Sequence, residues 1–219
     1  SGVVPLARAL NDANVRLIST GGTYDTLARE ITTAIQKVSD MIGFPEILGG
    51  RVKTLHPSVH GGVLARRDDP NHMSEIHDMG IGTIDFVICN LYPFVETVKK
   101  PNTKLEDALE NIDIGGPTLL RSAAKNFPFV VVVVDPGDYV WIADKIVNDG
   151  FSMEERRRLA YKAFRHVSLY DVAVSRYLSG DDGYQLHDNL DLMYQKSYNL
   201  RYGENPHQRA AVYSKASDY

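Results

Sequence analysis

The chain has 219 residues, enough for one large domain with a substantial core. Its hydrophobic content of 43% and charged content of 24% are ordinary for a soluble globular protein. A net charge of −4 argues against a nucleic-acid binder, which usually carries a basic face. The single cysteine excludes an internal disulfide framework, and no apolar run approaches the ~20 residues of a membrane helix. We therefore expect a cytoplasmic protein without membrane contact.

Short apolar runs alternate with helical patterns along the chain, which is typical of an α/β fold with a parallel sheet. The run 127–134 is apolar on both faces, as a central parallel strand should be. Asp135 should cap the helix after it, and Ser152 with Glu155 should form a capping box. In chain order we expect a helix over 2–10, a strand over 15–19, helices over 23–30 and 70–79, a strand over 84–91, helices over 104–112 and 115–126, a strand over 127–134, and helices over 135–148 and 152–178.

The stretch 179–191 is rich in glycine, aspartate and asparagine and is predicted to be a linker. We expect one domain over residues 1–195 and the truncated start of a second over 196–219. No strand precedes the helical pattern at the front of the chain, so we expect the first strand of the domain to lie before Ser1.

The segment from Gly50 to Gly62 has the sequence GRVKTLHPSVHGG. It contains two cationic side chains, two imidazoles and two hydroxyls between glycines. Arg51 can grip phosphate oxygens with two hydrogen bonds, Lys53 adds a point charge, and Thr54 adds a hydroxyl. The segment is predicted to be a loop with a turn at His56-Pro57. By itself it fits an anion site and a solvated basic loop equally well.

The motif Thr20-Gly21-Gly22-Thr23 follows a predicted strand and opens a helix. Glycines at such a position allow close approach of a phosphate, and the helix N-terminus favours negative charge. The motif is neither a P-loop nor a GxGxxG fingerprint, so it gives no support for nucleoside triphosphates or dinucleotides. A plain strand-to-helix turn remains the alternative.

Two further motifs carry groups that can handle protons. Tyr92 follows the strand of CNLYPF, where parallel sheets bind ligands, although a packed tyrosine is the simpler interpretation. Asp113 precedes the helix that carries Arg121 and Lys125. It is either a helix cap or one half of a carboxylate–lysine pair that moves protons. The alternative for Lys125 is a solvated cationic stripe.

The remaining candidates predict no metal or nucleophile. His56 and His60 are four residues apart, but Pro57 lies between them and no carboxylate completes a zinc motif. Cys89 lies in an apolar strand without a histidine nearby, so buried packing is the better interpretation.

Taken in order, STGGT, LGGRVKTLHPSVHGG, CNLYPF, IDIGGPTLLRSAAKN and LRYGENPHQ resemble the family of bifunctional AICAR transformylase/IMP cyclohydrolase proteins. The resemblance covers nearly the whole chain and points to the N-terminal cyclohydrolase domain. It implies a three-layer, methylglyoxal-synthase-like α/β fold. It also implies dehydrative ring closure of 5-formamidoimidazole-4-carboxamide ribotide (FAICAR) to inosine monophosphate (IMP). No metal or organic cofactor is implied for this step, and a homodimer is expected.

The resemblance also implies roles for individual residues. Lys125 corresponds to the proton donor and acceptor of the cyclisation, supported by Lys53, Tyr92 and Asp113. The residues implied to bind the nucleotide are Thr20, Gly21, Gly22, Thr23, Arg51, Lys53, Thr54, Cys89, Asn90, Asp113 and Ile114.

The family pattern extends beyond this chain at both ends. A strand and a phosphate-contacting loop would precede Ser1. Arg201 and Tyr202 correspond to residues that bind AICAR in the transformylase domain, whose catalytic pair would follow Tyr219. We therefore expect no formyl transfer from 10-formyltetrahydrofolate by this chain. The alternatives are a lyase for a triose phosphate on the same fold and a regulatory module that senses nucleotides without chemistry.

Overall fold

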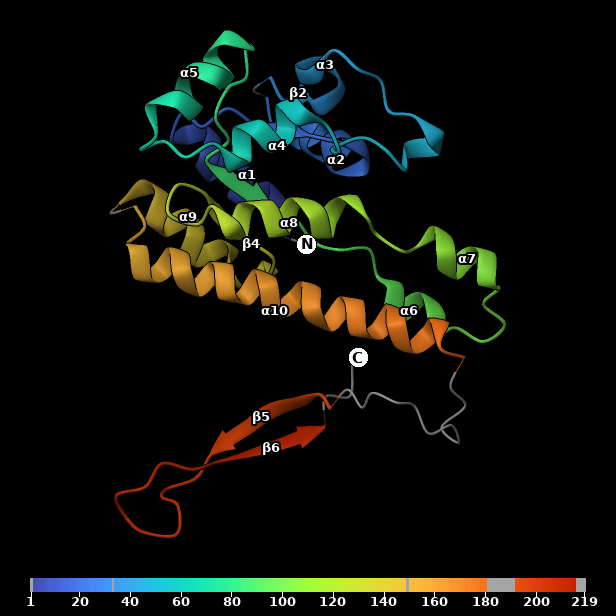
Figure 1. Cartoon of the computed structure of the whole chain (residues 1–219), viewed down its shortest axis with the longest axis vertical. Coiled ribbons are helices and arrows are strands. Elements are labelled where there is room, and N and C mark those ends of the chain that lie inside the picture. The colour runs from blue at the N-terminus through green and yellow to red at the C-terminus, as the bar shows by residue number, and fades with distance from the viewer. Residues whose placement is uncertain (1, 33, 149, 181–191, 216–219) are drawn as a thin grey trace. The chain divides into compact units, whose positions relative to one another are not determined.

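The computed structural model describes residues 2–32, 34–148, 150–180 and 192–215, and the chain divides into two units. The first unit comprises Ser1–Tyr92 and Asp113–Val167, and the second comprises Pro93–Ile112 and Ser168–Tyr219. The elements, labelled as in Figure 1, are α1 (Val3–Asp12), β1 (Ile18–Ser19), α2 (Gly21–Glu30), β2 (Gln36–Lys37), α3 (Val38–Ile42), η1 (Leu48–Gly50), α4 (Pro57–Leu64), α5 (Pro70–Asp78), β3 (Phe86–Ile88), α6 (Phe94–Val98), α7 (Leu105–Glu110), α8 (Gly115–Lys125), β4 (Val131–Val133), η2 (Pro136–Asp138), α9 (Tyr139–Val147), α10 (Met153–Leu178), β5 (Tyr194–Asn199) and β6 (Ala211–Lys215).

The strands of the first unit pair in parallel, which confirms the predicted α/β class. β1 pairs with β2, so that Ser19 lies opposite Lys37, and β3 pairs with β4, so that Phe86 lies opposite Val131. The hydrogen-bonded strands are shorter than the predicted runs, because pairing extends only where a partner strand runs alongside. The apolar residues beyond the strand ends still pack into the core.

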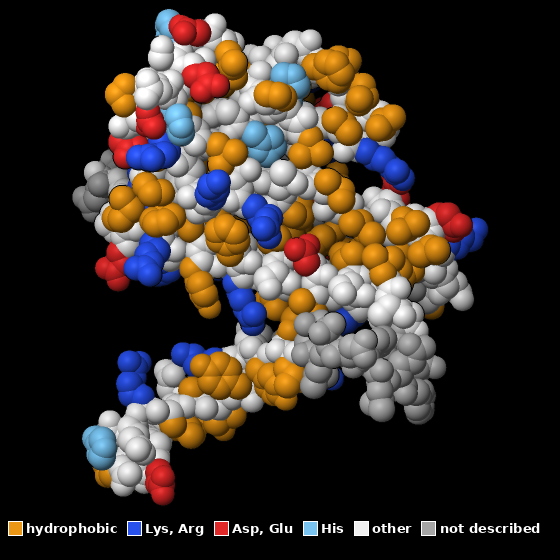
Figure 2. All heavy atoms as spheres, in the orientation of Figure 1, with side chains coloured by type: hydrophobic (Ala, Val, Ile, Leu, Met, Phe, Trp, Pro, Cys, Tyr) orange, Lys and Arg blue, Asp and Glu red, His pale blue; other side chains and the backbone are white. Residues whose placement is uncertain are grey.

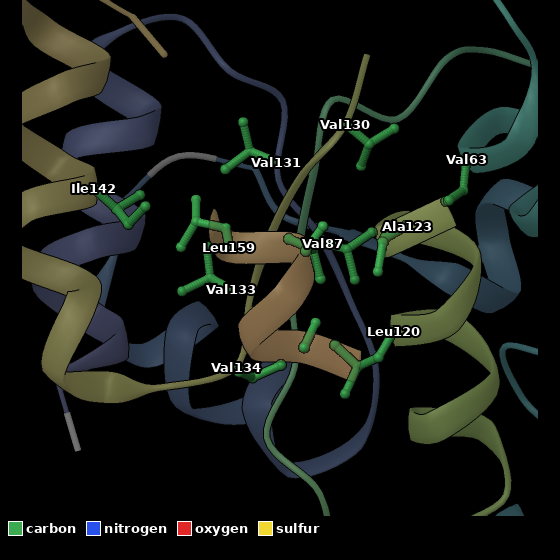
Figure 3. Close-up of a cluster of buried hydrophobic side chains, with 14 of the residues drawn as sticks. Val63, Val87, Leu120, Ala123, Val130, Val131, Val133, Val134, Ile142 and Leu159 are labelled. Atoms are coloured by element: carbon green, nitrogen blue, oxygen red, sulfur yellow. The ribbon is translucent and has the colours of Figure 1, made fainter. Parts of the chain in front are cut away.

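The core of the first unit is built around β4, all of whose residues are buried. Figure 3 shows Val131 and Val133 on the side of Ile142 and Leu159, whereas Val130 lies on the side of Val63. Alternate strand residues point to opposite faces, so one continuous valine run fills the space on both. A strand buried on both faces is therefore confirmed within the predicted run 127–134, although among the described residues it pairs with β3 alone.

The predicted caps are also present. The Ser152 backbone N–H donates to Glu155 Oε2 at 2.8 Å, and the Glu155 N–H donates to Ser152 Oγ at 3.2 Å, which completes the capping box. Asp135 accepts from the Gly137 N–H at 2.8 Å, but the element that it caps is the short 3₁₀ helix η2. The single helix predicted over 135–148 is thus η2 followed by α9.

The structure corrects the prediction for the segment 50–62, because its second half is the helix α4 rather than a loop. His56 caps this helix by accepting from the Ser58 N–H at 3.2 Å, and Pro57 occupies its first turn. A Cβ atom added to Gly61 would lie 3.4 Å from Ile81, which shows how closely the glycine-rich turn packs. The elements β2, α3, η1, α6, β5 and β6 were also not predicted.

The second unit contains α6, α7, the C-terminal part of α10 and the antiparallel hairpin β5–β6. Phe94 is buried and makes edge contacts with the rings of Tyr170 and Tyr177, at centroid distances of 6.1 and 5.6 Å. The Tyr170 hydroxyl donates to the Asn111 carbonyl at 3.1 Å. Most of the linker predicted over 179–191 lies outside the described residues.

Candidate nucleotide site

The N-terminus of α2 is the first part of the candidate site. Thr20 precedes the helix in an extended conformation, and its side chain makes no capping hydrogen bond. Gly21 has a φ of +49°, a left-handed conformation that favours glycine. A Cβ atom added to Gly21 would lie 3.8 Å from Lys53 Nζ, so the Lys53 ammonium group sits beside the start of the helix.

Lys53 links this helix terminus to the residue that follows β3. Its ammonium group donates to the Tyr92 hydroxyl oxygen at 3.2 Å and lies 5.8 Å from the centroid of the tyrosine ring. Tyr92 is 49% exposed, so its hydroxyl is accessible to a ligand. The structure thus brings together two residues that lie far apart in the sequence and were both predicted to belong to the site.

The N-terminus of α8 is the third part of the site. Asp113 Oδ1 accepts from the Gly116 N–H at 2.8 Å, so the predicted capping contact is present. A Cβ atom on Gly116 would lie 2.5 Å from Asp113 Oδ2 and 2.8 Å from Leu91, so a side chain there would displace Asp113 and Leu91. A Cβ atom on Gly115 would lie 3.0 Å from Thr54 Oγ1, which places the Thr54 hydroxyl at the same helix terminus.

Cys89 and Asn90, at the end of β3, adjoin this group. Burial raises the pKa of the Cys89 thiol to about 12, and the nearby Asp113 carboxylate adds to the shift while Lys53 opposes it. The thiol is therefore neutral at physiological pH, in agreement with packing rather than nucleophilic chemistry. Because the Asp113 and Lys53 charges both act on the Cys89 thiol, both side chains lie near the carboxyl end of β3.

Tyr139 is a residue of this region that the sequence did not reveal. Its buried hydroxyl donates to Asn90 Oδ1 at 2.8 Å, while Asn90 Nδ2 donates to the Val134 carbonyl at 2.8 Å. The Asn90 amide therefore ties the end of β3 to the residues that follow β4. Burial, together with the charge of the Asp135 carboxylate, raises the pKa of the Tyr139 hydroxyl and keeps it protonated as a donor.

The other predicted residues lie at different distances from this group. Arg51 is exposed in the turn after η1. Ile114 is 59% exposed directly before α8. Lys125 is the last residue of α8, ten residues beyond Gly115, which corresponds to about 15 Å along the helix axis. The structure therefore does not place Lys125 beside Asp113. Arg201 and Tyr202 lie in the second unit, between β5 and β6.

A cavity of about 300 Å³ opens beside the start of α2. It was not predicted as a whole, because the strand β2 that forms one wall is only two residues long and shows no sequence pattern. The residues that line the cavity are Ser19, Thr20, Gly21, Tyr24, Asp25, Lys37, Ser39 and Glu46.

The described residues contain no cluster of three or more His, Cys, Asp or Glu side chains arranged to hold a metal ion. In the same part of the chain, no helix has the length and apolar character needed to cross a membrane. On the face shown in Figure 2, basic side chains are dispersed among apolar and acidic ones rather than gathered into one positive surface.

Comparisons with known proteins agree with these features. Residues 2–118 match the family model described as the MGS-like domain, and residues 123–219 match the model of the AICARFT/IMPCHase bienzyme. The chain belongs to the family of MGS-like domains. The match of its second half to the AICARFT/IMPCHase bienzyme confirms the resemblance drawn from the sequence motifs.

Relatives with known names support the same assignment. The chain is 48% identical over 215 residues to the bifunctional purine biosynthesis protein PurH of Halalkalibacterium halodurans, and 49% identical over 213 residues to that of Thermoanaerobacter sp. (strain X514). These matches cover 98% and 97% of the chain but only 42% of each relative, so the chain spans about two fifths of their length. The crystal structure of ForH matches with a TM-score of 0.72 and 36% identity, over 83% of this chain and 93% of that one.

Proposed function

We propose that this domain is an IMP cyclohydrolase, which closes the ring of FAICAR to give IMP. The observation that carries the proposal is the convergence of Lys53, Tyr92 and Asp113 from three separate sequence motifs. These side chains lie at the carboxyl end of β3 and at two helix N-termini. Such strand ends are where parallel sheets bind ligands. The relatives are purine biosynthesis proteins, which supports the same class of substrate.

The chemistry requires groups that move protons and stabilise charge. The carboxamide nitrogen attacks the formyl carbon, a C–N bond forms, and the electrons of the carbonyl bond move to the formyl oxygen. The C–O bond then breaks and water leaves, having taken one hydrogen from the carboxamide nitrogen and one from the formamide nitrogen. The nitrogen must lose a proton and the oxygen must gain protons before it departs.

The residues present can supply both kinds of group. We propose that Asp113 accepts the proton from the carboxamide nitrogen. The Lys53 ammonium group and the Tyr92 hydroxyl, which are hydrogen-bonded to each other, stabilise the charge on the formyl oxygen. Because the reaction is intramolecular, holding the two groups in contact supplies a large part of the rate.

The phosphate of the nucleotide is proposed to bind at the start of α2, where Thr20 to Thr23 meet Lys53. Arg51 and Thr54 complete this region, and Cys89, Asn90 and Ile114 line the base and ribose. Ring closure is proposed to need neither metal nor folate, with 10-formyltetrahydrofolate serving only the transformylase half of the longer relatives. Arg201 and Tyr202 are proposed to bind AICAR in that half. We further propose that the protein is cytoplasmic and acts as a homodimer.

The direct test is to add FAICAR to the chain and follow the absorbance of the hypoxanthine ring. We expect turnover without folate and in the presence of a chelator. Tyr92→Phe should lower kcat about 10- to 100-fold, because it removes a hydroxyl that bonds to Lys53. The matched control is Tyr161→Phe on α10, a tyrosine that is 71% exposed, and it should keep the parent rate.

Two results would contradict the proposal. Loss of activity with chelator and its return with a divalent metal would rule out the metal-free mechanism. Tight binding of IMP without any turnover of FAICAR would favour the regulatory module instead.

A further inference from the structure

Lys37 occupies a place in the fold where ligand-binding residues are expected. It is the last residue of β2 and lies opposite Ser19, the last residue of β1, in the parallel register of these strands. Thr20 and Gly21 follow Ser19 directly and begin α2. The carboxyl ends of both strands therefore meet at the point where the phosphate is proposed to bind, and Lys37 is the residue that β2 contributes there.

The side chain of Lys37 is held toward the cavity beside α2. Its ammonium group lies 4.8 Å from the centroid of the Tyr24 ring, a cation–π contact within the usual range. Tyr24, Thr20, Gly21 and Lys37 all line this cavity of about 300 Å³. The tyrosine ring thus restrains the flexible side chain of Lys37 at the cavity.

The charges around the cavity indicate that the Lys37 ammonium group is needed there to attract an anion. Two carboxylates, Asp25 and Glu46, line the same cavity and would repel a phosphate group. Lys53 lies beside Gly21 but also donates to Tyr92, so its charge is shared with the part of the site where the ring closes. Among the residues that line the cavity, Lys37 is the cation that offsets the two carboxylates.

We propose that Lys37 is a specificity-determining residue that binds the phosphate group of the nucleotide and so selects phosphorylated over unphosphorylated ligands. This inference rests on the proposed function, and it adds a residue that none of the sequence motifs contains. Lys37 takes no part in the ring closure itself. Its loss should therefore raise KM and leave kcat nearly unchanged.

The test is calorimetric titration of the chain with IMP and with inosine, which lacks the phosphate. Lys37→Gln should bind IMP about tenfold more weakly than the parent and should bind inosine as the parent does. Lys37→Arg, which keeps the charge, should stay within about threefold of the parent for IMP. The matched control is Lys100→Gln, an exposed lysine of the second unit with the same change in charge, and it should change neither affinity.

The possible failures are distinguishable. If the parent binds IMP and closes FAICAR but Lys37→Gln has the parent's affinity for IMP, this inference is wrong and the proposed function stands. Equal weakening of IMP and inosine binding by Lys37→Gln would also overturn it, because the lysine would then support the structure rather than the phosphate. A parent chain that binds no IMP and closes no FAICAR overturns both.

Discussion

Lys125, which the family resemblance implies to be the proton donor and acceptor of the cyclisation, is the residue whose role depends most on the position of the ligand. It is exposed at the C-terminal end of α8, where a lysine is favourable as structure alone because it complements the helix dipole. About 15 Å of helix separates it from Gly115, next to which Asp113 is held. Side chains on a helix generally lean toward its N-terminus, a direction that would shorten the distance from Lys125 to the site. A nucleotide lying along α8 would thus contact both ends.

We predict that Lys125→Ala lowers kcat on the order of 100-fold or more and changes the affinity for IMP little, because the contact forms mainly in the transition state. Lys125→Arg should not restore the rate, since a guanidinium keeps its charge but does not release its proton. Steady-state kinetics with FAICAR and titration with IMP measure the two effects. If Lys125→Ala turns over FAICAR at the parent rate, the prediction is wrong and Lys125 serves only as a cation at the end of the helix.

The sequence singled out candidate site residues most readily where several lie within one motif. The RVKT run, the tyrosine after β3 and the aspartate before α8 were identified, and the structure brings Lys53, Tyr92 and Asp113 to one region. Lys37 and Tyr139 were not identified as site residues. The first lies on a strand too short to show periodicity, and the second acts through a hydrogen bond to Asn90 that only the folded chain creates.

At the scale of elements, a half-buried histidine, His60, lies where α4 packs on α8. His60 Nδ1 lies 3.0 Å from Ser122 Oγ, and the Ser122 hydroxyl donates its hydrogen to the Thr118 carbonyl at 2.9 Å. With the hydroxyl hydrogen on the carbonyl, the tautomer that fits is the one in which Nδ1 carries the proton and donates to the serine oxygen. Nε2 is then the unprotonated nitrogen, and it is buried without a hydrogen-bond partner among the described residues.

This arrangement predicts a pH-dependent stability. Burial lowers the pKa of His60 below its usual value of about 6.5, so the unfolded chain takes up a proton there more readily than the folded one. The resulting stability is present above about pH 6.5 and is lost as the pH falls through the folded pKa. Burial lowers the pKa of His166 in the same direction, so His60 accounts for only part of the loss.

We expect the urea midpoint to fall between pH 7.5 and pH 5.5, and to fall less steeply in His60→Gln than in the parent. Ser122→Ala is the control, because it removes the hydrogen bond at every pH but keeps the half-buried imidazole. Its midpoint should be lower throughout, with the slope of the parent. Equal slopes in His60→Gln and the parent would show that this histidine does not couple folding to pH.

Helix α4 also shows where prediction of elements fails. Two glycines and a proline within SVHGG and its flanks indicate a loop by composition, yet the segment is helical. Pro57 and His56 begin the helix correctly, and the glycines allow it to approach Ile81 and Ile84 closely. Tertiary packing overrides the low helix propensity of glycine here. The local sequence pattern does not reveal this packing, because the contacts are with residues that lie further along the chain.

At the scale of the whole molecule, the two units differ in how their strands are stabilised. β4 in the first unit is buried on both faces within the valine core. The hairpin β5–β6 in the second unit has a fully exposed strand β5, and Tyr194, Tyr198 and Tyr213 are between 50% and 59% exposed. An isolated two-stranded hairpin is marginally stable in water, because it buries too little apolar surface to offset its ordering entropy.

We therefore predict that the amides of Tyr194–Asn199 and Ala211–Lys215 exchange with solvent on the order of 100-fold faster, or more, than those of Val131–Val133. Amide hydrogen exchange read by mass spectrometry or NMR measures this on the monomeric chain, with the oligomeric state checked by sedimentation. A higher protein concentration should slow exchange in the hairpin if a second copy covers it, since mass action then favours the paired state. Protection of the hairpin equal to that of β4 in a monomer would show that its own cross-strand contacts suffice to hold it.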